Sequence, residues 1–89
     1  MSSNNPAALS TENEARLRSV MTETLGVTTA DLTEDASPQT IPSWTSLNHL
    51  SLMAAVEETF GVTFSMEEMG AAGESLAHLR RLLAKNLAV

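Results

Sequence analysis

Apolar residues recur at helical spacing in the first third of the chain, over about residues 12–25. The positions on this face are Leu17, Val20, Met21 and Leu25. Thr11 and Glu14 fit a capping box, with Thr11 as the N-cap and Glu14 reaching back to it, and Gly26 is a natural stop. We therefore predict a helix from 12 to 25, preceded by a disordered tail at residues 1–9.

The strongest helical pattern begins after Thr45, which is a suitable N-cap, and ends at Phe60-Gly61. It has two apolar faces. The first comprises Leu52, Met53, Val56 and Phe60. The second, adjacent face comprises Leu47, Leu50 and Ala54. A helix with more apolar surface than a small core can use often keeps part of it for a partner.

Two more helices are predicted towards the C-terminus. Ser65 and Glu68 form a second capping box, which opens a short helix that Gly70 ends, and a flexible turn continues to Gly73. Ser75 then caps a last helix. Its core-facing stripe consists of Leu76, Leu79, Leu82, Leu83 and Leu87.

The connection from Gly26 to Ser43 is unusually long for a compact domain, and Pro38 and Pro42 keep its end from being helical. We expect its isolated apolar residues to point inward, with one short helical turn around residues 29–32. These residues are Val27, Leu32, Ala36 and Ile41. Residues 62–64 alternate like a strand, but three residues without a partner do not make a sheet.

Together these elements predict an all-α protein with one domain over residues 10–89. We expect a four-helix bundle with three main helices, one short third helix, and a long loop between the first two. Such a bundle has no strand for a nucleotide-binding sheet, and the sequence has no glycine-rich phosphate loop.

Composition narrows the classes of function. The 89 residues include no cysteine, which excludes disulfides, thiolate metal sites and a cysteine nucleophile. No signal peptide or membrane-spanning stretch is readable, so we expect a cytoplasmic protein that does not enter a membrane. The net charge is −6, and no Lys or Arg occurs from Ser19 to Leu79. This acidity disfavours nucleic acid and favours a protein partner with a basic patch, although acidic residues also simply keep small domains soluble.

Ser46 and His49 are three residues apart on the second predicted helix, so a nucleophile and base could share a face there. The sequence supplies no partner to orient the imidazole, no oxyanion site and no pocket. We therefore predict that the protein is not an enzyme, and that His49 is an ordinary surface histidine. His49 and His78 are too isolated to propose a metal site.

Ser46 also lies in the predicted first turn of that helix, where free backbone N–H groups and the helix dipole favour an anion. Its simplest role is to share helix capping with Thr45. A functional role would be to carry a phosphate ester.

Residues 41–50, IPSWTSLNHL, are followed by residues 56–62, VEETFGV, and together they resemble the acyl carrier protein family. Members typically show Trp or a similar residue, then Asp-Ser-Leu, then a helix that ends in a Leu-Glu-Glu-x-Phe-Gly-like segment. The resemblance extends roughly from Leu17 to Leu83. It includes the acidic bias, the long first loop and the short third helix.

The resemblance implies that a phosphopantetheinyl transferase attaches 4′-phosphopantetheine from coenzyme A to Ser46. The terminal thiol would hold an acyl, polyketide or aminoacyl group, and the protein would carry it as a monomer between loading ligases and synthases, as in fatty acid or polyketide biosynthesis. The partner surface would be Leu47, Leu50, Ala54, Glu57 and Glu58, facing basic docking patches.

Thr45 departs from the family pattern, because the residue before the serine is usually Asp. Both residues can cap a helix, so we expect the fold to be kept. Thr brings no charge for the modifying enzyme and its metal. The alternative is therefore a carrier-like interaction domain that is never modified.

Overall fold

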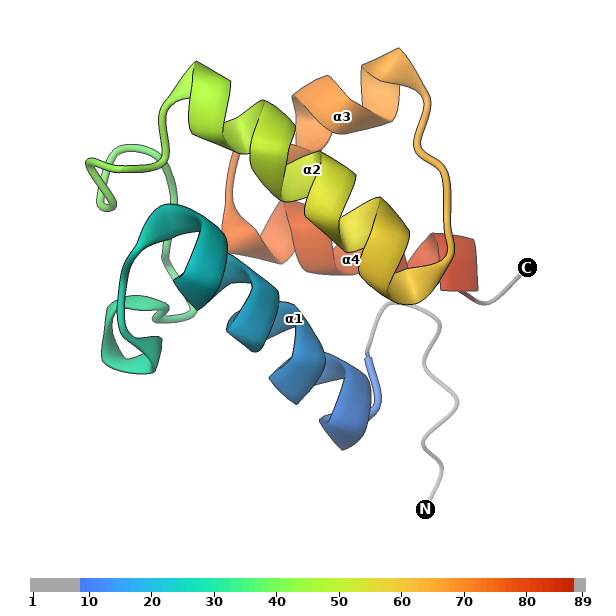
Figure 1. The fold of residues 1–89 in the computed structure, drawn as a ribbon, viewed down its shortest axis with the longest axis horizontal. Coiled ribbons are helices and arrows are strands. Elements are labelled where there is room, and N and C mark those ends of the chain that lie inside the picture. Colours follow the sequence, from blue (N-terminus) through green and yellow to red (C-terminus); the bar gives the residue numbers. More distant parts are fainter. Residues whose placement is uncertain (1–8, 88–89) are drawn as a thin grey trace.

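The computed structural model describes residues 9–87, and all regular elements in that range are helices (Figure 1). They are α1 (Thr11–Leu25), the 3-10 helix η1 (Thr29–Asp31), α2 (Ser46–Phe60), α3 (Met66–Ala72) and α4 (Leu76–Leu87). The prediction of an all-α fold is confirmed for this range, and residues 62–64 form no strand. The predicted tail at residues 1–9 lies outside the described residues except for Leu9, which packs against the core.

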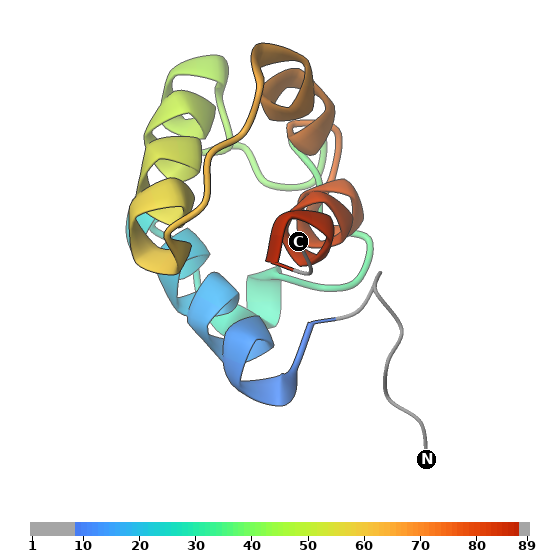
Figure 2. The same cartoon turned by 90° about the vertical axis from the view of Figure 1, so that its right-hand side faces the viewer.

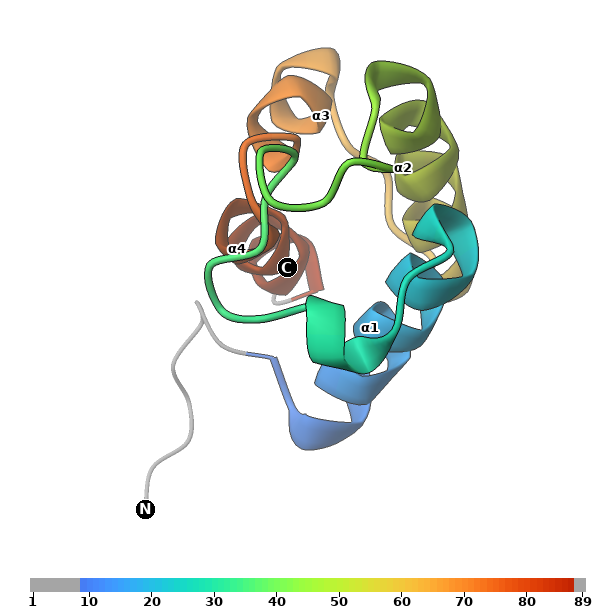
Figure 3. The ribbon, with the colours of Figure 1, turned by 90° about the vertical axis from the view of Figure 1, so that its left-hand side faces the viewer.

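The helices form two packed pairs, α1 with α2 and α3 with α4. In Figure 1, α1 and α2 run in opposite directions, and Figure 2 shows the two pairs from one end of the bundle. The long connection crosses the opposite end, which faces the viewer in Figure 3. The backbone N–H of Leu76 donates to the carbonyl oxygen of Ala36 at 2.9 Å and ties this connection to the start of α4.

The core lies between the two pairs and is sealed by the long connection. Its fully buried helical residues are Leu17, Met21, Leu52, Met53, Val56, Ala72, Leu76, Leu79 and Leu83. As predicted, Leu32, Ala36 and Ile41 are buried and Val27 packs against the core from a half-buried position. Leu82 and Leu87 of the predicted α4 stripe are only half-buried at its edge.

The predicted cap of α1 is wrong by one residue. Ser10 is the N-cap, and its hydroxyl accepts from the backbone N–H of Asn13 at 3.1 Å. Glu14 does not reach back to the helix start, because its carboxylate binds two arginines instead. Charge-assisted hydrogen bonds of this kind are about twice as strong as neutral ones.

The predicted end of α3 is also wrong. Gly70 is helical, α3 continues to Ala72, and Gly73 is the C-cap. Ala72 is completely buried, so the extra turn places an apolar side chain in the core. The glycine stops predicted for the other helices do hold, because Gly26 and Gly61 both adopt a left-handed φ of 67°.

A network of charged residues joins α1, the long connection and α4. Arg80 donates to Glu14 through two nitrogens, each at 2.9 Å, and to Glu34 at 3.0 Å. Arg18 donates to Glu14 at 2.8 Å and to the carbonyl oxygen of Leu32. Burial alone would raise the pKa of Glu14, but the hydrogen bonds and charges of Arg80 and Arg18 outweigh it and lower that pKa.

Candidate functional site

The start of α2 is built by local contacts. Thr45 is the N-cap as predicted, since its hydroxyl accepts from the backbone N–H of Asn48 at 3.1 Å. The Asn48 side chain in turn donates to the carbonyl oxygen of Ser43 at 2.8 Å. These two bonds hold the incoming loop against the first turn, so the position of Ser46 is set by the loop as well as by the helix.

Ser46 is the first residue of α2, and its side chain is exposed. Thr45 caps only the N–H of Asn48, so the backbone N–H groups of Ser46 and Leu47 have no hydrogen-bond partner within the part of the chain that the structure describes. These N–H groups and the helix dipole make the surroundings of the Ser46 hydroxyl favourable for negative charge.

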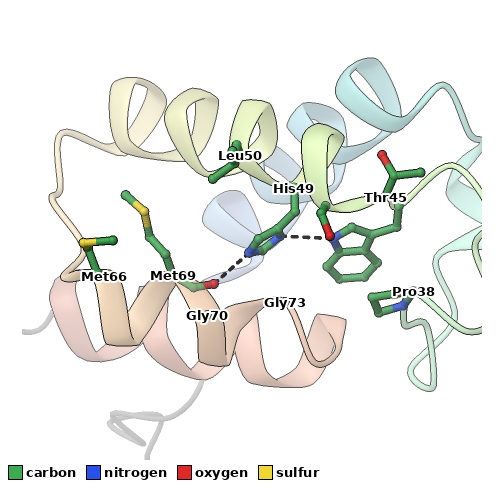
Figure 4. Close-up of a pocket in the computed structure, with 10 residues that line it drawn as sticks. Pro38, Thr45, His49, Leu50, Met66, Met69, Gly70 and Gly73 are labelled. Carbon is green, nitrogen blue, oxygen red and sulfur yellow. Dashed lines mark hydrogen bonds between the residues drawn. The ribbon is translucent and has the colours of Figure 1, made fainter.

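A cavity of about 580 Å³ opens beside Ser46, between α2 and α3 (Figure 4). Its lining is mainly apolar and comprises Pro38, Trp44, Thr45, Ser46, His49, Leu50, Met66, Met69, Gly70 and Gly73. Trp44 is buried, whereas Leu50 and Met66 lie at the mouth with large exposed surfaces. The sequence had indicated no pocket at Ser46, because the α3 side of this cavity comes from residues 20 or more positions further along the chain.

The prediction that His49 is an ordinary surface histidine is wrong. Its side chain is half-buried and projects from α2 towards α3, where Nε2 lies 2.7 Å from the carbonyl oxygen of Met69 (Figure 4). Its Nδ1 accepts from the indole Nε1–H of Trp44 at 3.1 Å. Both ring nitrogens therefore have partners.

This arrangement argues against Ser46 and His49 as a nucleophile and base. The imidazole is oriented, which the sequence alone had not indicated, but neither of its nitrogens is bonded to Ser46. A general base needs a free lone pair within hydrogen-bond reach of the hydroxyl. That lone pair is occupied here by the Trp44 indole.

The residues of the predicted partner surface divide into two groups. Leu47 and Leu50 are 73% and 60% exposed, and Ala54 and Glu58 are exposed as well. Glu57 is instead half-buried, and its carboxylate accepts from the backbone N–H of Phe64 at 2.8 Å. Glu57 thus holds the α2–α3 connection, which leaves less of its charge for a partner.

Met66 is an exposed apolar residue that the sequence reasoning missed. It is 89% exposed at the first position of α3 and faces the cavity mouth across from Leu50 (Figure 4). The sequence did contain a sign of this exposure. Met66 directly follows the Ser65 cap, and so it precedes the buried positions of α3. Leu47, Leu50 and Met66 are the three large apolar residues that are exposed in the described range, and we use the term "rim" for them.

Other kinds of site are not seen in residues 9–87. No three His, Asp or Glu side chains in this range lie close enough to hold a metal ion. No helix in the same range is both long and apolar enough to cross a membrane.

Neither protein-family models, nor curated proteins, nor solved structures match the chain. Residues 9–87 form an all-helical fold with four α-helices.

Proposed function

We propose that this protein is a carrier in which Ser46 holds 4′-phosphopantetheine and thereby an acyl, polyketide or aminoacyl intermediate. The observation that carries the proposal is the exposed Ser46 hydroxyl in the first turn of α2, where two backbone N–H groups lack partners in the described residues, at the edge of an apolar cavity. The likeness of residues 41–62 to acyl carrier proteins gives the same serine the same role. The helical bundle with a long first loop and a short third helix is the arrangement that this family would require.

The residues around Ser46 are suited to a covalently attached 4′-phosphopantetheine. In the attachment step, the Ser46 oxygen attacks the phosphorus that bears the pantetheine arm in coenzyme A. A new P–O bond forms, the pyrophosphate bond breaks, the nucleotide part leaves, and a base of the transferase takes the hydroxyl proton. The resulting phosphodiester is an anion, and the free N–H groups and dipole of α2 stabilise negative charge at that position. When attached, the arm supplies the thiol that holds cargo as a thioester.

The rim and the acidic residues of α2 suit transient partners. Leu47 and Leu50 offer apolar contact area close to Ser46, and Glu58 adds exposed negative charge. Electrostatic steering speeds association with basic patches on transferases, ligases and synthases without requiring tight binding, so release stays fast. The apolar cavity beside Ser46 could shelter apolar cargo during transfer.

The modification can be tested by mass spectrometry of the intact chain. After incubation with coenzyme A and a broad-specificity phosphopantetheinyl transferase, we expect the wild type to gain the mass of one phosphopantetheine group. Ser46→Ala should gain nothing, whereas Ser51→Ala, which removes another exposed serine of α2, should be modified like the wild type. An unmodified wild type, under conditions that modify a known carrier protein, would contradict the proposal.

Thr45 supports a second candidate, an interaction domain of the same shape that is not modified. Thr45 caps α2 through one hydrogen bond, from the backbone N–H of Asn48 to its hydroxyl, but places no carboxylate next to Ser46. We expect Thr45→Asp to speed modification by attracting the transferase and its metal, with stability changed by less than about 0.5 kcal/mol because both residues cap well. The initial rate of mass gain measures this. Modification of Thr45→Asp alone, with the wild type inert, would favour the second candidate.

A further inference from the structure

We propose that His49 is a proton-sensitive positioning residue of the cavity beside Ser46. As a neutral imidazole, it holds Trp44 and α3 in place through one hydrogen bond to each. The proposal does not depend on modification of Ser46. It rests on three observations: the two hydrogen bonds of the ring, the lack of other bonds across the seam between α2 and α3, and the absence of other titratable groups in the cavity lining.

The hydrogen bonds allow one protonation state of His49. The indole N–H of Trp44 is a donor only, so Nδ1 of His49 must accept at 3.1 Å. The Met69 carbonyl oxygen is an acceptor only, so Nε2 must carry the proton and donate at 2.7 Å. Only the neutral imidazole with its proton on Nε2 satisfies both partners.

The ring bridges a seam that is otherwise weakly held. The packed pairs are α1 with α2 and α3 with α4, and the cavity separates α2 from α3. Within residues 9–87, the His49–Met69 bond is the only hydrogen bond between α2 and α3. The ring also fits closely against Gly73, where an added Cβ would lie 3.1 Å from Nε2. His49 therefore sets how α3 sits over this cavity.

A second proton on His49 is incompatible with this closed arrangement. Protonated Nδ1 becomes a donor and would point its N–H at the N–H of Trp44. Trp44 is only 3% exposed, and His49 is the only hydrogen-bond partner of its indole N–H in the described residues. Either the imidazolium or the indole must swing out, because a buried donor without an acceptor is costly. Acid should thus loosen the cavity wall.

No other ionisable group lines the cavity or hydrogen-bonds to His49 in the described range. The charged or titratable residues of the surrounding elements are Asp31, Glu34 and Asp35 in the connection, Glu57 and Glu58 on α2, Glu67 and Glu68 on α3, and Glu74, His78, Arg80, Arg81 and Lys85 on or before α4. Several are bonded elsewhere, Glu57 to Phe64, Glu68 to Ser65 and Glu74 to His78. A pH-dependent change of the cavity would therefore report the hydrogen bonds of His49.

The single tryptophan of the chain makes the transition measurable. On the unmodified protein, Trp44 emission and its quenching by acrylamide are followed from about pH 8 to about pH 5, the range in which imidazoles titrate. We expect one transition, with a red shift and stronger quenching at the acid end, and unchanged far-UV circular dichroism. His49→Gln should abolish it, since the neutral amide can accept and donate but does not titrate. His78→Gln should keep it.

A transition that persists in His49→Gln, or a wild type without one, would overturn the proposal. If His49→Gln does not fold, the wild type alone still decides the matter by proton NMR. The Trp44 indole N–H resonance should move upfield as its hydrogen bond is lost, with the same midpoint as the His49 ring protons. An indole resonance that stays unchanged while His49 titrates would contradict it.

Discussion

Replacement of Leu79 by alanine should lower the free energy of unfolding by about 2–5 kcal/mol. Leu79 lies on α4, is fully buried, and belongs to the core that joins the two helix pairs. The substitution removes buried methyl groups and leaves a cavity that the surrounding helices cannot fill completely. Total stabilities of small domains are about 5–15 kcal/mol, so this loss would be a large fraction. Urea unfolding followed by circular dichroism measures it.

The matched control is Leu47→Ala, the same substitution at an exposed site. Leu47 is 73% exposed, so its truncation should change stability by no more than about 0.5 kcal/mol. If the protein is a carrier, Leu47→Ala should instead slow modification of Ser46 by weakening contact with the transferase. Equal losses of stability for the two variants would contradict the division of leucines into core and rim.

Glu14→Gln should lower the free energy of unfolding by about 1–3 kcal/mol at neutral pH, because two half-buried arginines, Arg18 and Arg80, lose their shared anionic partner. Arg80 would lose two charge-assisted bonds, and Arg18 would lose one. The control is Glu12→Gln on the same helix. Glu12 is exposed and contacts only the exposed Arg16 at 3.3 Å, so we expect little effect there. Urea midpoints of the two variants and the wild type provide the comparison.

The pH dependence of this effect has a definite sign. The pKa of Glu14 in the folded state lies below its ordinary value of 4.5, so its contribution is complete above that value. The contribution is lost as the pH falls through the lowered pKa, where the folded protein takes up the proton. Stabilities of the wild type and Glu14→Gln should therefore converge in acid. A difference that stays constant from neutral pH to about pH 3 would rule out this linkage.

Helix capping illustrates how far sequence reasoning extends. Thr45 and Ser65 cap their helices as predicted, since a cap is a contact between residues three apart. Gly26 and Gly61 end α1 and α2 for the same local reason. The predictions were wrong for Thr11 and Gly70, where distant partners decide the outcome: Glu14 turns to Arg80, and Ala72 is drawn into the core.

The sequence by itself determined the helices, the inward residues of the long connection, and the position of Ser46 at the start of α2. These follow from apolar spacing, caps and prolines, all of which act over a few residues. Only the tertiary structure decided the roles of His49, Glu14 and Glu57. His49 meets Met69 twenty positions away, Glu14 meets Arg80 sixty-six positions away, and Glu57 closes the connection to α3. A side-chain hydrogen bond between residues far apart in the sequence follows no periodicity along the chain, so its partner becomes known only when the helices pack.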